Sequence, residues 1–396
     1  MTEEQRDLRD AVRGLLARAG RKPDDGDGCD RALWERLCRE IGVAGLAIPE
    51  RFGGAGAGPA ETHVVMAELG RTLAPVPMLG SAVLAAQALL AAGDEAACER
   101  LLPAIADGTA VAALAWAPES GAWNPGEAAF TAAPPASATS PADPASAAGA
   151  GSPAGHDRDP AGWQLAGEAH YVLDGDVADV LLAAAATPDG IALFEVDLAG
   201  TGVSRAAATA MDTTRRLAVV RLDGAAGRLI GAAGSGSGGC SALGRARDLA
   251  CIALGAEQAG AAEQALELTV AYTRDRVQFG RPIGSFQALQ HRMAGLHILV
   301  ESARSLSHAA AAAAAGDAPD LALQAAAVKA HCSETLLTVA AEMIQLHGAI
   351  AITWEHDAHR YFKRAHGAAH LFGPPSAHLA RVAAQVVDGS ALADGA

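Results

Sequence analysis

The chain has 396 residues and a formal charge of −15, from 30 lysines and arginines against 45 aspartates and glutamates. Hydrophobic residues make up 51% but aromatic residues only 4%, which predicts two or three domains with a core of small aliphatic side chains in packed helices. This composition excludes disorder for most of the chain, and the acidic balance argues against nucleic acid or an anionic membrane as the main partner.

The cysteines and the N-terminus bear on the compartment. Six cysteines are scattered without a C-x-x-C pair, which fits neither a zinc site nor a disulfide framework. The first 13 residues carry charges of both signs and lack the apolar core of a signal peptide. No uninterrupted apolar stretch of about 18 residues is of the type that spans a membrane. We therefore expect a soluble, cytoplasmic protein with reduced thiols.

The first third of the chain is predicted to be helical. Leu8, Val12 and Leu15 recur at helical spacing. A turn-rich stretch covers 48–56, and prolines 75 and 77 break the chain. Further helices are expected at about 33–41, 60–71, 79–92 and 95–102. Together they predict an N-terminal helical domain over 1–110.

Strand patterns appear in the middle third. Short apolar runs predict strands, and Asp174-Gly175 and Asp189-Gly190 are turn dipeptides between them. A stretch rich in Ala, Pro, Ser and Gly, 131–161, is predicted to be a low-complexity surface loop. The expected strands are 111–116, 163–173, 180–185, 191–196 and 217–222, which predict a small β domain over 111–235.

The helical period returns near Ser241 and continues to the end. Long helices are expected over 243–274, 286–314 and 321–347, enough for a four-helix bundle within 236–396. The order helices, strands, helices predicts an α+β fold that is mainly helical.

Several common site motifs are absent from the sequence. No G-x-G-x-x-G is expected to follow a strand and open a helix, and no Walker, G-x-S-x-G or H-E-x-x-H motif occurs. His356 and His359 are three residues apart, and His366 and His370 are four apart, but neither pair has a third ligand at a matching offset. Solvated helix-face histidines are the preferred explanation, so no metal site is predicted.

Two segments are denser in specific chemistry. The first, 272–291, ends a long helix with arginines, makes a Gly/Pro turn and restarts with Ser285 as a candidate N-cap. Its arginines could neutralise a pyrophosphate, although an ordinary helix hairpin remains the alternative. In the second segment, 345–357, a helix stops at Gly348, where small residues allow the backbone to approach a ligand closely. The structural alternative is an ordinary glycine C-cap beside a buried Trp354.

Together, in this order and at this separation, these segments resemble the acyl-CoA dehydrogenase family. Its members carry a Y-x-x-x-R-x-Q-F-G-x-P-I-x-x-F-Q-x-x-Q-H stretch and a later Q-x-x-G-G segment. The stretches 45–54, 68–75 and 171–175 are also similar, so the resemblance covers nearly the whole chain outside 131–161. Residues 212–218 and 353–357 look most like actinobacterial members that act on bulky or steroid-derived thioesters.

The resemblance implies a fold, a cofactor and a reaction. The fold is an N-terminal helical domain, a central small β-barrel-like domain and a C-terminal four-helix bundle. Members bind FAD between subunits and remove two hydrogens from the α and β carbons of an acyl-CoA. A carboxylate takes the α proton, flavin N5 takes the β hydride, and electrons pass to an acceptor protein. The implied assembly is a homo-dimer or homo-tetramer, or a hetero-oligomer with a paralogous subunit.

Site residues follow from the resemblance position by position. Asp248 matches a position that helps to hold the acyl-CoA. A purely structural role stays open for each single contact. The positions that match family contacts to FAD are Arg276, Gln278, Phe279, Gln287, Gln345, Gly348 and Ala349. At the last of these, alanine replaces a glycine, and its methyl group could crowd the cofactor.

The match fails where the family keeps its catalytic base. One branch has a glutamate where this chain has Phe372, and another has it where this chain has Ala250. The catalytic residue is therefore unknown, with Asp248, Glu355 and His370 as substitutes to consider. On the flavin side, Leu173 stands for the threonine near N5, and Tyr171 for the tryptophan beside the ring.

Three hypotheses follow. The chain is a flavin-dependent acyl-CoA dehydrogenase with an unrecognised base. Alternatively, it is a catalytically degenerate subunit that completes the FAD site of an active partner. The third hypothesis is a flavoprotein of this fold that performs another oxidation in secondary metabolism.

Overall fold

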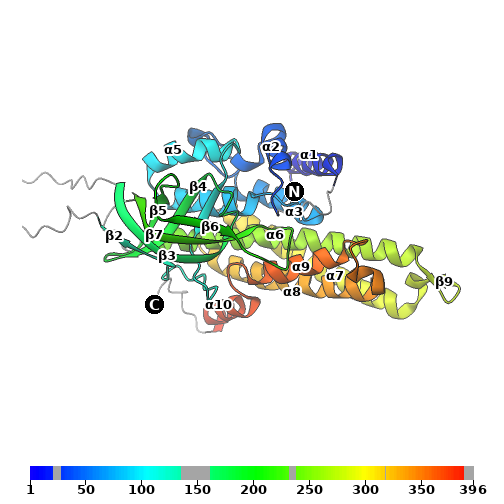
Figure 1. The fold of residues 1–396 in the computed structure, drawn as a ribbon. Helices are drawn as coiled ribbons and strands as arrows, with labels where there is room; N and C mark the ends of the chain where they lie inside the picture. The colour runs from blue at the N-terminus through cyan, green and yellow to red at the C-terminus, as the bar shows by residue number, and fades with distance from the viewer. Residues whose placement is uncertain (21–27, 135–160, 232–237, 317, 388–396) are drawn as a thin grey trace, which may run out of the picture.

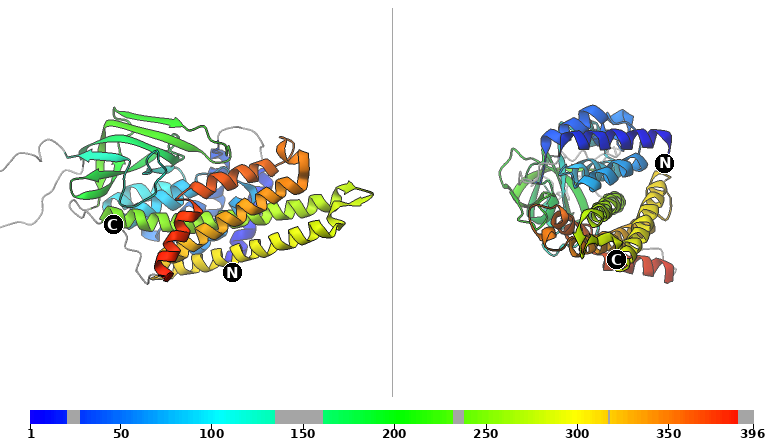
Figure 2. Two further views of the ribbon diagram at one scale, coloured as in Figure 1. Left: turned by 90° about the horizontal axis from the view of Figure 1, so that it is seen from below. Right: turned by 90° about the vertical axis from the view of Figure 1, so that its right-hand side faces the viewer.

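The computed structural model describes residues 1–20, 28–134, 161–231, 238–316 and 318–387. Its elements follow the predicted order. N-terminal helices and a β-barrel lie side by side at one end, and long helices extend from them to a narrow tip (Figure 1). The end-on view in Figure 2 shows the N-terminal helices, the sheet and the long helices around one centre.

Capped amphipathic helices form the N-terminal part. Thr2 makes a reciprocal capping box with Gln5, and Asp30 and Asp94 cap the second and fifth helices through their carboxylates. Their apolar faces turn inward and form a core with the later helices. The bounds are α1 (Glu3–Ala19), α2 (Arg31–Ile41), α3 (Pro59–Thr72), α4 (Ala86–Ala92) and α5 (Glu95–Ala106).

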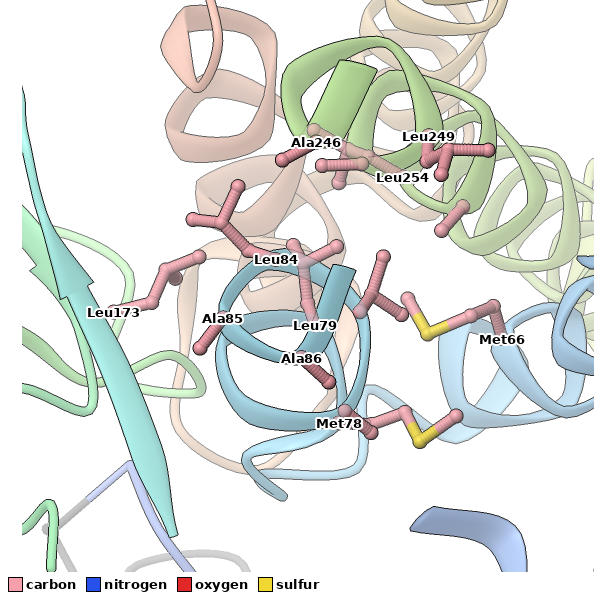
Figure 3. Packing of buried hydrophobic residues seen from close by; sticks show 14 of the residues in the cluster. Met66, Met78, Leu79, Leu84, Ala85, Ala86, Leu173, Ala246, Leu249 and Leu254 are labelled. Atoms are coloured by element: carbon pink, nitrogen blue, oxygen red, sulfur yellow. The ribbon is translucent and has the colours of Figure 1, made fainter. Parts of the chain in front are cut away.

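A π-helix precedes α4. Residues Met78–Ala85 form it, where the sequence predicts one continuous helix over 79–92. Every one of its eight residues is buried, because it runs through the middle of the first core (Figure 3). Met66 of α3, Leu173 of the barrel and Leu254 of the long helix that follows the barrel approach this segment from three directions. Such π segments occur frequently at functional sites.

The β part closes on itself. Strand β4 pairs with β2 on one side and with β5 on the other, and β2, β3, β7 and β5 complete the ring. A second apolar core that includes Phe130, Leu181 and Phe194 fills the interior. The bounds are β1 (Ala112–Ala115), β2 (Phe130–Ala133), β3 (Ala161–Leu173), β4 (Val180–Thr187), β5 (Gly190–Val196), β6 (Val203–Ala207) and β7 (Leu217–Ile230).

Long helices build the remainder. The longest, α6 (Gly238–Asp275), packs against the N-terminal helices along one part and against the other bundle helices along the rest. A small hairpin of β8 (Val277–Gln278) and β9 (Arg281–Pro282) follows at the tip. The other helices are α7 (Gln287–Ala315), α8 (Leu321–His347), α9 (Ala358–His370) and α10 (Pro375–Val387).

Within the described segments, one helix is long and apolar enough to cross a membrane by length and composition. It is α8 with the 3₁₀ turn after it, Leu321–Ile352. In the structure α8 lies inside the bundle, packed against α6, α7, α9 and α10. It also carries Lys329, which is fully buried. These contacts are those of the core helix of a bundle.

The structure corrects some local predictions. Strands β2 and β6 were not predicted, and β2 takes in Thr131–Ala133 at the start of the expected surface loop. Residues 135–160 of that loop lie outside the described residues. Ser285 is not the N-cap of α7, because it lies in a 3₁₀ turn and donates its hydroxyl to the Pro282 carbonyl at 2.6 Å. Phe286 occupies the N-cap position. The division at 110 and 235 stays a prediction.

Two glycines let α3 and α6 approach closely. A Cβ at Gly260 would lie 2.0 Å from the carbonyl oxygen of Ala67, and one at Gly70 would lie 2.0 Å from that of Glu257. We predict that Gly260→Ala forces the helices apart and lowers the free energy of unfolding by about 3 kcal/mol. In α7, a Cβ at Gly295 would meet nothing within 4 Å. Gly295→Ala should therefore stabilise by about 0.5–1 kcal/mol. Urea unfolding of both variants measures the difference, and equal effects would contradict the close crossing.

Candidate cofactor and active site

The two motif segments lie at the same end of the bundle. Tyr272 near the end of α6 donates its hydroxyl to the His347 carbonyl at the end of α8, at 3.2 Å. Their rings stack with centroids 4.3 Å apart, and His356 packs on His347 at 4.4 Å. The segments 276–287 and 345–349, far apart in the sequence, thus lie toward the same end of the bundle, with the hairpin projecting beyond the end of α8 (Figures 1 and 2).

The hairpin at this tip exposes its functional groups. Phe279 sits at the turn with φ +53° and is 92% exposed. Arg276, Gln278 and Gln287 are exposed as well. Arg281 stacks its guanidinium on the Phe286 ring at 4.0 Å. The ion pairs among the described residues do not include Arg274, Arg276 or Arg281, so three cationic groups are free to meet an anion.

The end of α8 is open as well. Gly348 has φ +68° and ψ −145°, a conformation that favours glycine, and a Cβ there would meet nothing within 4 Å. Gln345 and Ala349 are exposed, and the backbone of Ala349 has no positive φ, so alanine is tolerated there without strain. Trp354 is 64% exposed, which corrects the alternative of a buried tryptophan.

These residues fit one side of an FAD site. Unpaired arginines suit the dianionic pyrophosphate, and the open glycine turn lets backbone approach a ligand. All of the matched side chains face outward from this chain. A cofactor held by them would therefore lie largely against a second subunit.

Aromatic rings occupy the position of the family's base. Phe372 is 2% exposed and has φ +60°. Its ring meets Trp123 edge to face at 5.0 Å, and Trp123 meets Trp116 in the same way at 5.6 Å. We call Trp116, Trp123 and Phe372 the aromatic cluster. The other family position, Ala250, is fully buried on α6.

Buried polar contacts hold the segment that carries Phe372. His378 of α10 lies with Nε2 2.9 Å from the Phe372 carbonyl oxygen, and burial lowers the pKa of this histidine to about 3. Lys329 of α8 donates to the Ala369 carbonyl at 3.0 Å. The ring of Phe372 is thereby fixed in the aromatic cluster.

None of the substitute bases is placed for proton transfer. Asp248 is buried, but its carboxylate accepts from Arg247 at 3.2 Å and from Arg381 at 3.1 Å. Glu355 and His370 lie on the surface. Asp248 is also the residue predicted to hold acyl-CoA, and in this structure two arginines already engage it.

The flavin-side positions are buried or strained. Leu173 is 3% exposed, whereas Tyr171 is 40% exposed and donates its hydroxyl to the Glu119 carbonyl at 3.2 Å. Positive φ occurs at five described non-glycine residues, and all five belong to segments with family motifs or to the base position. Strained backbone of this kind concentrates at functional sites. The five are Leu73, Tyr171, Asp174, Phe279 and Phe372.

Sequence reasoning missed a buried ionic cluster. Arg215 contacts both carboxylate oxygens of Glu257 at 2.5 and 2.6 Å, and Arg364 contacts Glu257 at 3.0 Å. Asp212 lies 3.2 Å from Arg364. The D-T-T-R-R sequence at 212–216 marked this segment as family-like, but nothing in the sequence pointed to its partners on α6 and α9.

Asp174 stands beside this cluster and should make stability depend on pH. Its side chain is buried, and desolvation raises its pKa from 3.8 to about 7 against the opposing charge of Arg215. The folded state therefore holds this proton more tightly than the unfolded chain. The contribution of the Asp174 carboxyl group to the free energy of unfolding is fully present below about pH 4 and is lost as the pH rises to 7.

Asp174→Asn removes that dependence. We predict that the variant gains stability relative to the natural chain between pH 5 and 7.5, with no further gain above that. Urea unfolding at several pH values checks this. A difference that stays constant with pH would contradict the buried carboxyl.

Histidines and cysteines form no metal-ligand group in the described part of the chain. His356 accepts from the Ala358 amide at 3.1 Å, and His359 packs on Trp354 with centroids 4.7 Å apart. All six cysteines are free thiols.

The chain is similar to known proteins along nearly its whole length. The family models "Acyl-CoA dehydrogenase, N-terminal domain" and "Acyl-CoA dehydrogenase, C-terminal domain" match residues 2–109 and 239–387. Acyl-CoA dehydrogenase IpdE2 of Mycolicibacterium smegmatis is 38% identical, over 98% of this chain and 100% of its own length. IpdE2 of Mycobacterium tuberculosis is 39% identical, over 97% and 98%.

Solved structures add the assembly of two similar proteins. A variant of the Tcur3481-Tcur3483 steroid acyl-CoA dehydrogenase is 30% identical with a TM-score of 0.80, covering 98% of both chains. The ChsE4-ChsE5 complex of Mycobacterium tuberculosis is 28% identical with a TM-score of 0.82, covering 99% of both. Each carries the names of two different chains.

Proposed function

This chain belongs to the acyl-CoA dehydrogenase family, and on this premise we propose that it acts as the base-lacking subunit of a hetero-oligomer. The family reaction is the FAD-dependent α,β-dehydrogenation of an acyl-CoA to the enoyl-CoA. When FAD is bound, it supplies the flavin ring that accepts the β hydride. In our proposal a paralogous subunit supplies the carboxylate that takes the α proton, and this chain completes that subunit's FAD site.

The observation that carries the proposal is the ring of Phe372. At the place where a carboxylate would abstract the α proton, this chain has an apolar side chain packed edge to face on Trp123. A phenyl ring cannot accept a proton, and the ring of Phe372 is only 2% exposed. The outward-facing Arg276 hairpin is retained, so the chain keeps the half-site that it would lend to a partner.

Relatives support a mixed assembly. The Tcur3481-Tcur3483 and ChsE4-ChsE5 structures each pair two chains. A steroid-derived or otherwise bulky acyl group, an electron-transfer protein as acceptor and a cytoplasmic location belong to the same proposal. In the proposed assembly, the arginines of this chain neutralise the pyrophosphate of FAD. The aromatic cluster fills the base position of this chain and so keeps water and thioester out of it.

Co-expression with the paralogue tests this assignment. We expect one FAD for each pair of unlike chains, acyl-CoA-dependent reduction of an acceptor dye by the complex, and a colourless product when this chain is purified alone. The control is the complex with the partner's catalytic carboxylate changed to its amide, which should keep its FAD and lose turnover. One FAD per copy of this chain alone, with turnover at the rate of the complex, would overturn the proposal.

A further inference from the structure

Three aromatic rings stack at the end of the bundle, between the two segments of the candidate cofactor site. Tyr272 lies near the end of α6, His347 is the last residue of α8, and His356 precedes α9. The Tyr272 and His347 ring centroids lie 4.3 Å apart with 26° between the ring planes, and the His356 ring lies 4.4 Å from that of His347. We call these three residues the ring stack. It joins the helix that leads into the hairpin of Arg276 to the helix that leads into the Gly348 turn.

A hydrogen bond inside the ring stack holds the start of the glycine turn. The Tyr272 hydroxyl donates to the His347 carbonyl oxygen at 3.2 Å. The last four carbonyl groups of an α-helix lack a partner within that helix, and this hydroxyl contacts one of them. The same peptide group joins His347 to Gly348, whose φ of +68° begins the turn. Tyr272 therefore fixes the entry to the turn from α6.

The hydrogen bonds of the two histidines fix where their ring hydrogens lie. His347 is 4% exposed, and its Nδ1 lies 2.8 Å from the Met343 carbonyl oxygen. A carbonyl only accepts, so Nδ1 carries the hydrogen and Nε2 of the neutral ring is an acceptor. The Ala358 amide donates to His356 Nδ1 at 3.1 Å, so that nitrogen carries no hydrogen.

Protonation of either histidine would cost free energy. His347 Nε2 is buried and makes no hydrogen bond within the described residues, so a hydrogen added there would be an unsatisfied donor. A hydrogen added to His356 Nδ1 would break its contact with the Ala358 amide. Two imidazolium rings with centroids 4.4 Å apart would also repel each other. The ring stack is therefore most stable when both histidines are neutral.

Burial and the nearby charges together keep both rings neutral. Burial lowers the pKa of His347, the Met343 carbonyl opposes this effect, and His356 adds to it. Burial also lowers the pKa of His356, and Asp357, which pairs with Arg360 of α9 at 3.6 Å, acts in the opposite direction. From α6 the rings face the phenol of Tyr272. Because the unfolded chain binds these protons more tightly, the ring stack is stable at neutral pH and loses stability as the pH falls below the ordinary histidine pKa of 6.5.

We propose that the ring stack positions the hairpin of Arg276 and the Gly348 turn against each other for one FAD molecule, and that it does so only while His347 and His356 are neutral. This inference rests on the proposed function, because the two segments act only when a partner subunit binds FAD against them. His347 is buried, so it acts through the peptide that it holds and is a positioning residue. Two segments that are already fixed lose less conformational freedom when a ligand binds, and this saving strengthens FAD binding.

Titration of the cofactor-free hetero-oligomer with FAD at pH 8, followed by flavin fluorescence, tests the positioning role. Tyr272→Phe keeps the ring but loses one hydrogen bond, and it should weaken FAD binding about two- to tenfold. His347→Ala removes the middle ring and should weaken FAD binding at least about tenfold, whereas His347→Phe keeps a ring and should stay within about threefold of the natural complex. Urea unfolding checks that each variant is folded. A folded His347→Ala variant with unchanged FAD affinity would contradict the positioning role.

Acid separates a role that depends on charge from one that depends on packing alone. Between pH 8 and pH 5, the natural complex should lose at least about threefold more FAD affinity than the His347→Phe complex, which cannot hold two charges in the ring stack. The control is His297→Gln on α7, an exposed histidine outside the ring stack, and this variant should lose as much affinity as the natural complex. Equal losses in the natural and His347→Phe complexes would overturn the requirement for neutral histidines.

The same titrations distinguish this inference from the proposed function. A natural complex that binds no FAD would overturn both. A natural complex that binds FAD, with the same affinity in Tyr272→Phe and His347→Ala, would overturn the role of the ring stack and leave the proposed function standing.

Discussion

Phe372→Glu should destabilise the chain by at least about 3 kcal/mol and should create no dehydrogenase activity in the chain alone. The ring is 2% exposed and packs on Trp123 at 5.0 Å, and removal of a buried phenyl group costs about 3–5 kcal/mol. The new carboxyl group would be buried against Trp123, where desolvation disfavours it. Urea unfolding and acyl-CoA-dependent dye reduction are the measurements.

Phe279→Glu is the matched control for stability. Phe279 is 92% exposed, so the same change there should alter the free energy of unfolding by no more than about 0.5 kcal/mol. If Phe372→Glu folds normally and the isolated chain then oxidises acyl-CoA, the aromatic cluster is not a barrier. The missing carboxylate would in that case be the only defect of the site.

The helical parts of the fold were predictable because their periodicity is long. The predicted helix over 321–347 coincides with α8, and the one over 243–274 falls within α6. Strands β2 and β6 were missed because each is short, and β2 opens into an alanine- and proline-rich run that reads as loop. The π-helix Met78–Ala85 was invisible for another reason: its residues are buried on all sides, so no periodicity distinguishes it from an α-helix.

The candidate site also has parts that the sequence predicted and parts that it could not. The hairpin at 277–282 and the glycine turn at 348 are local features, and their sequence motifs predicted the segments. The sequence alone predicted that position 372 lacks a glutamate. It could not predict that the Phe372 ring packs on Trp123, because this contact joins loops that are far apart in the chain. The setting of Arg215 likewise depends on Glu257 of α6 and on Asp174 at the end of β3, which only the tertiary fold brings together.

Arg276→Met should lower the FAD affinity of the hetero-oligomer by about 10- to 100-fold. Arg276 is exposed on the hairpin with no ion pair to any described residue, so removing it leaves no buried charge in this chain unpaired. A charge-assisted hydrogen bond to a phosphate contributes about 1.5–3 kcal/mol, and each 1.4 kcal/mol is a factor of ten in affinity. Titration of the cofactor-free complex with FAD, followed by flavin fluorescence, measures the change.

The control is an arginine elsewhere on the surface. Arg36 of α2 pairs with Glu40 at 3.2 Å, so Arg36→Met removes the same positive charge from the chain and should leave FAD affinity unchanged. The loss at Arg276 should also shrink as salt is raised, because an exposed cation and a pyrophosphate are screened. Equal losses in the two variants would show that net charge alone is responsible. No loss at Arg276 would remove the hairpin from the cofactor site and, with it, the half-site that this chain is proposed to lend.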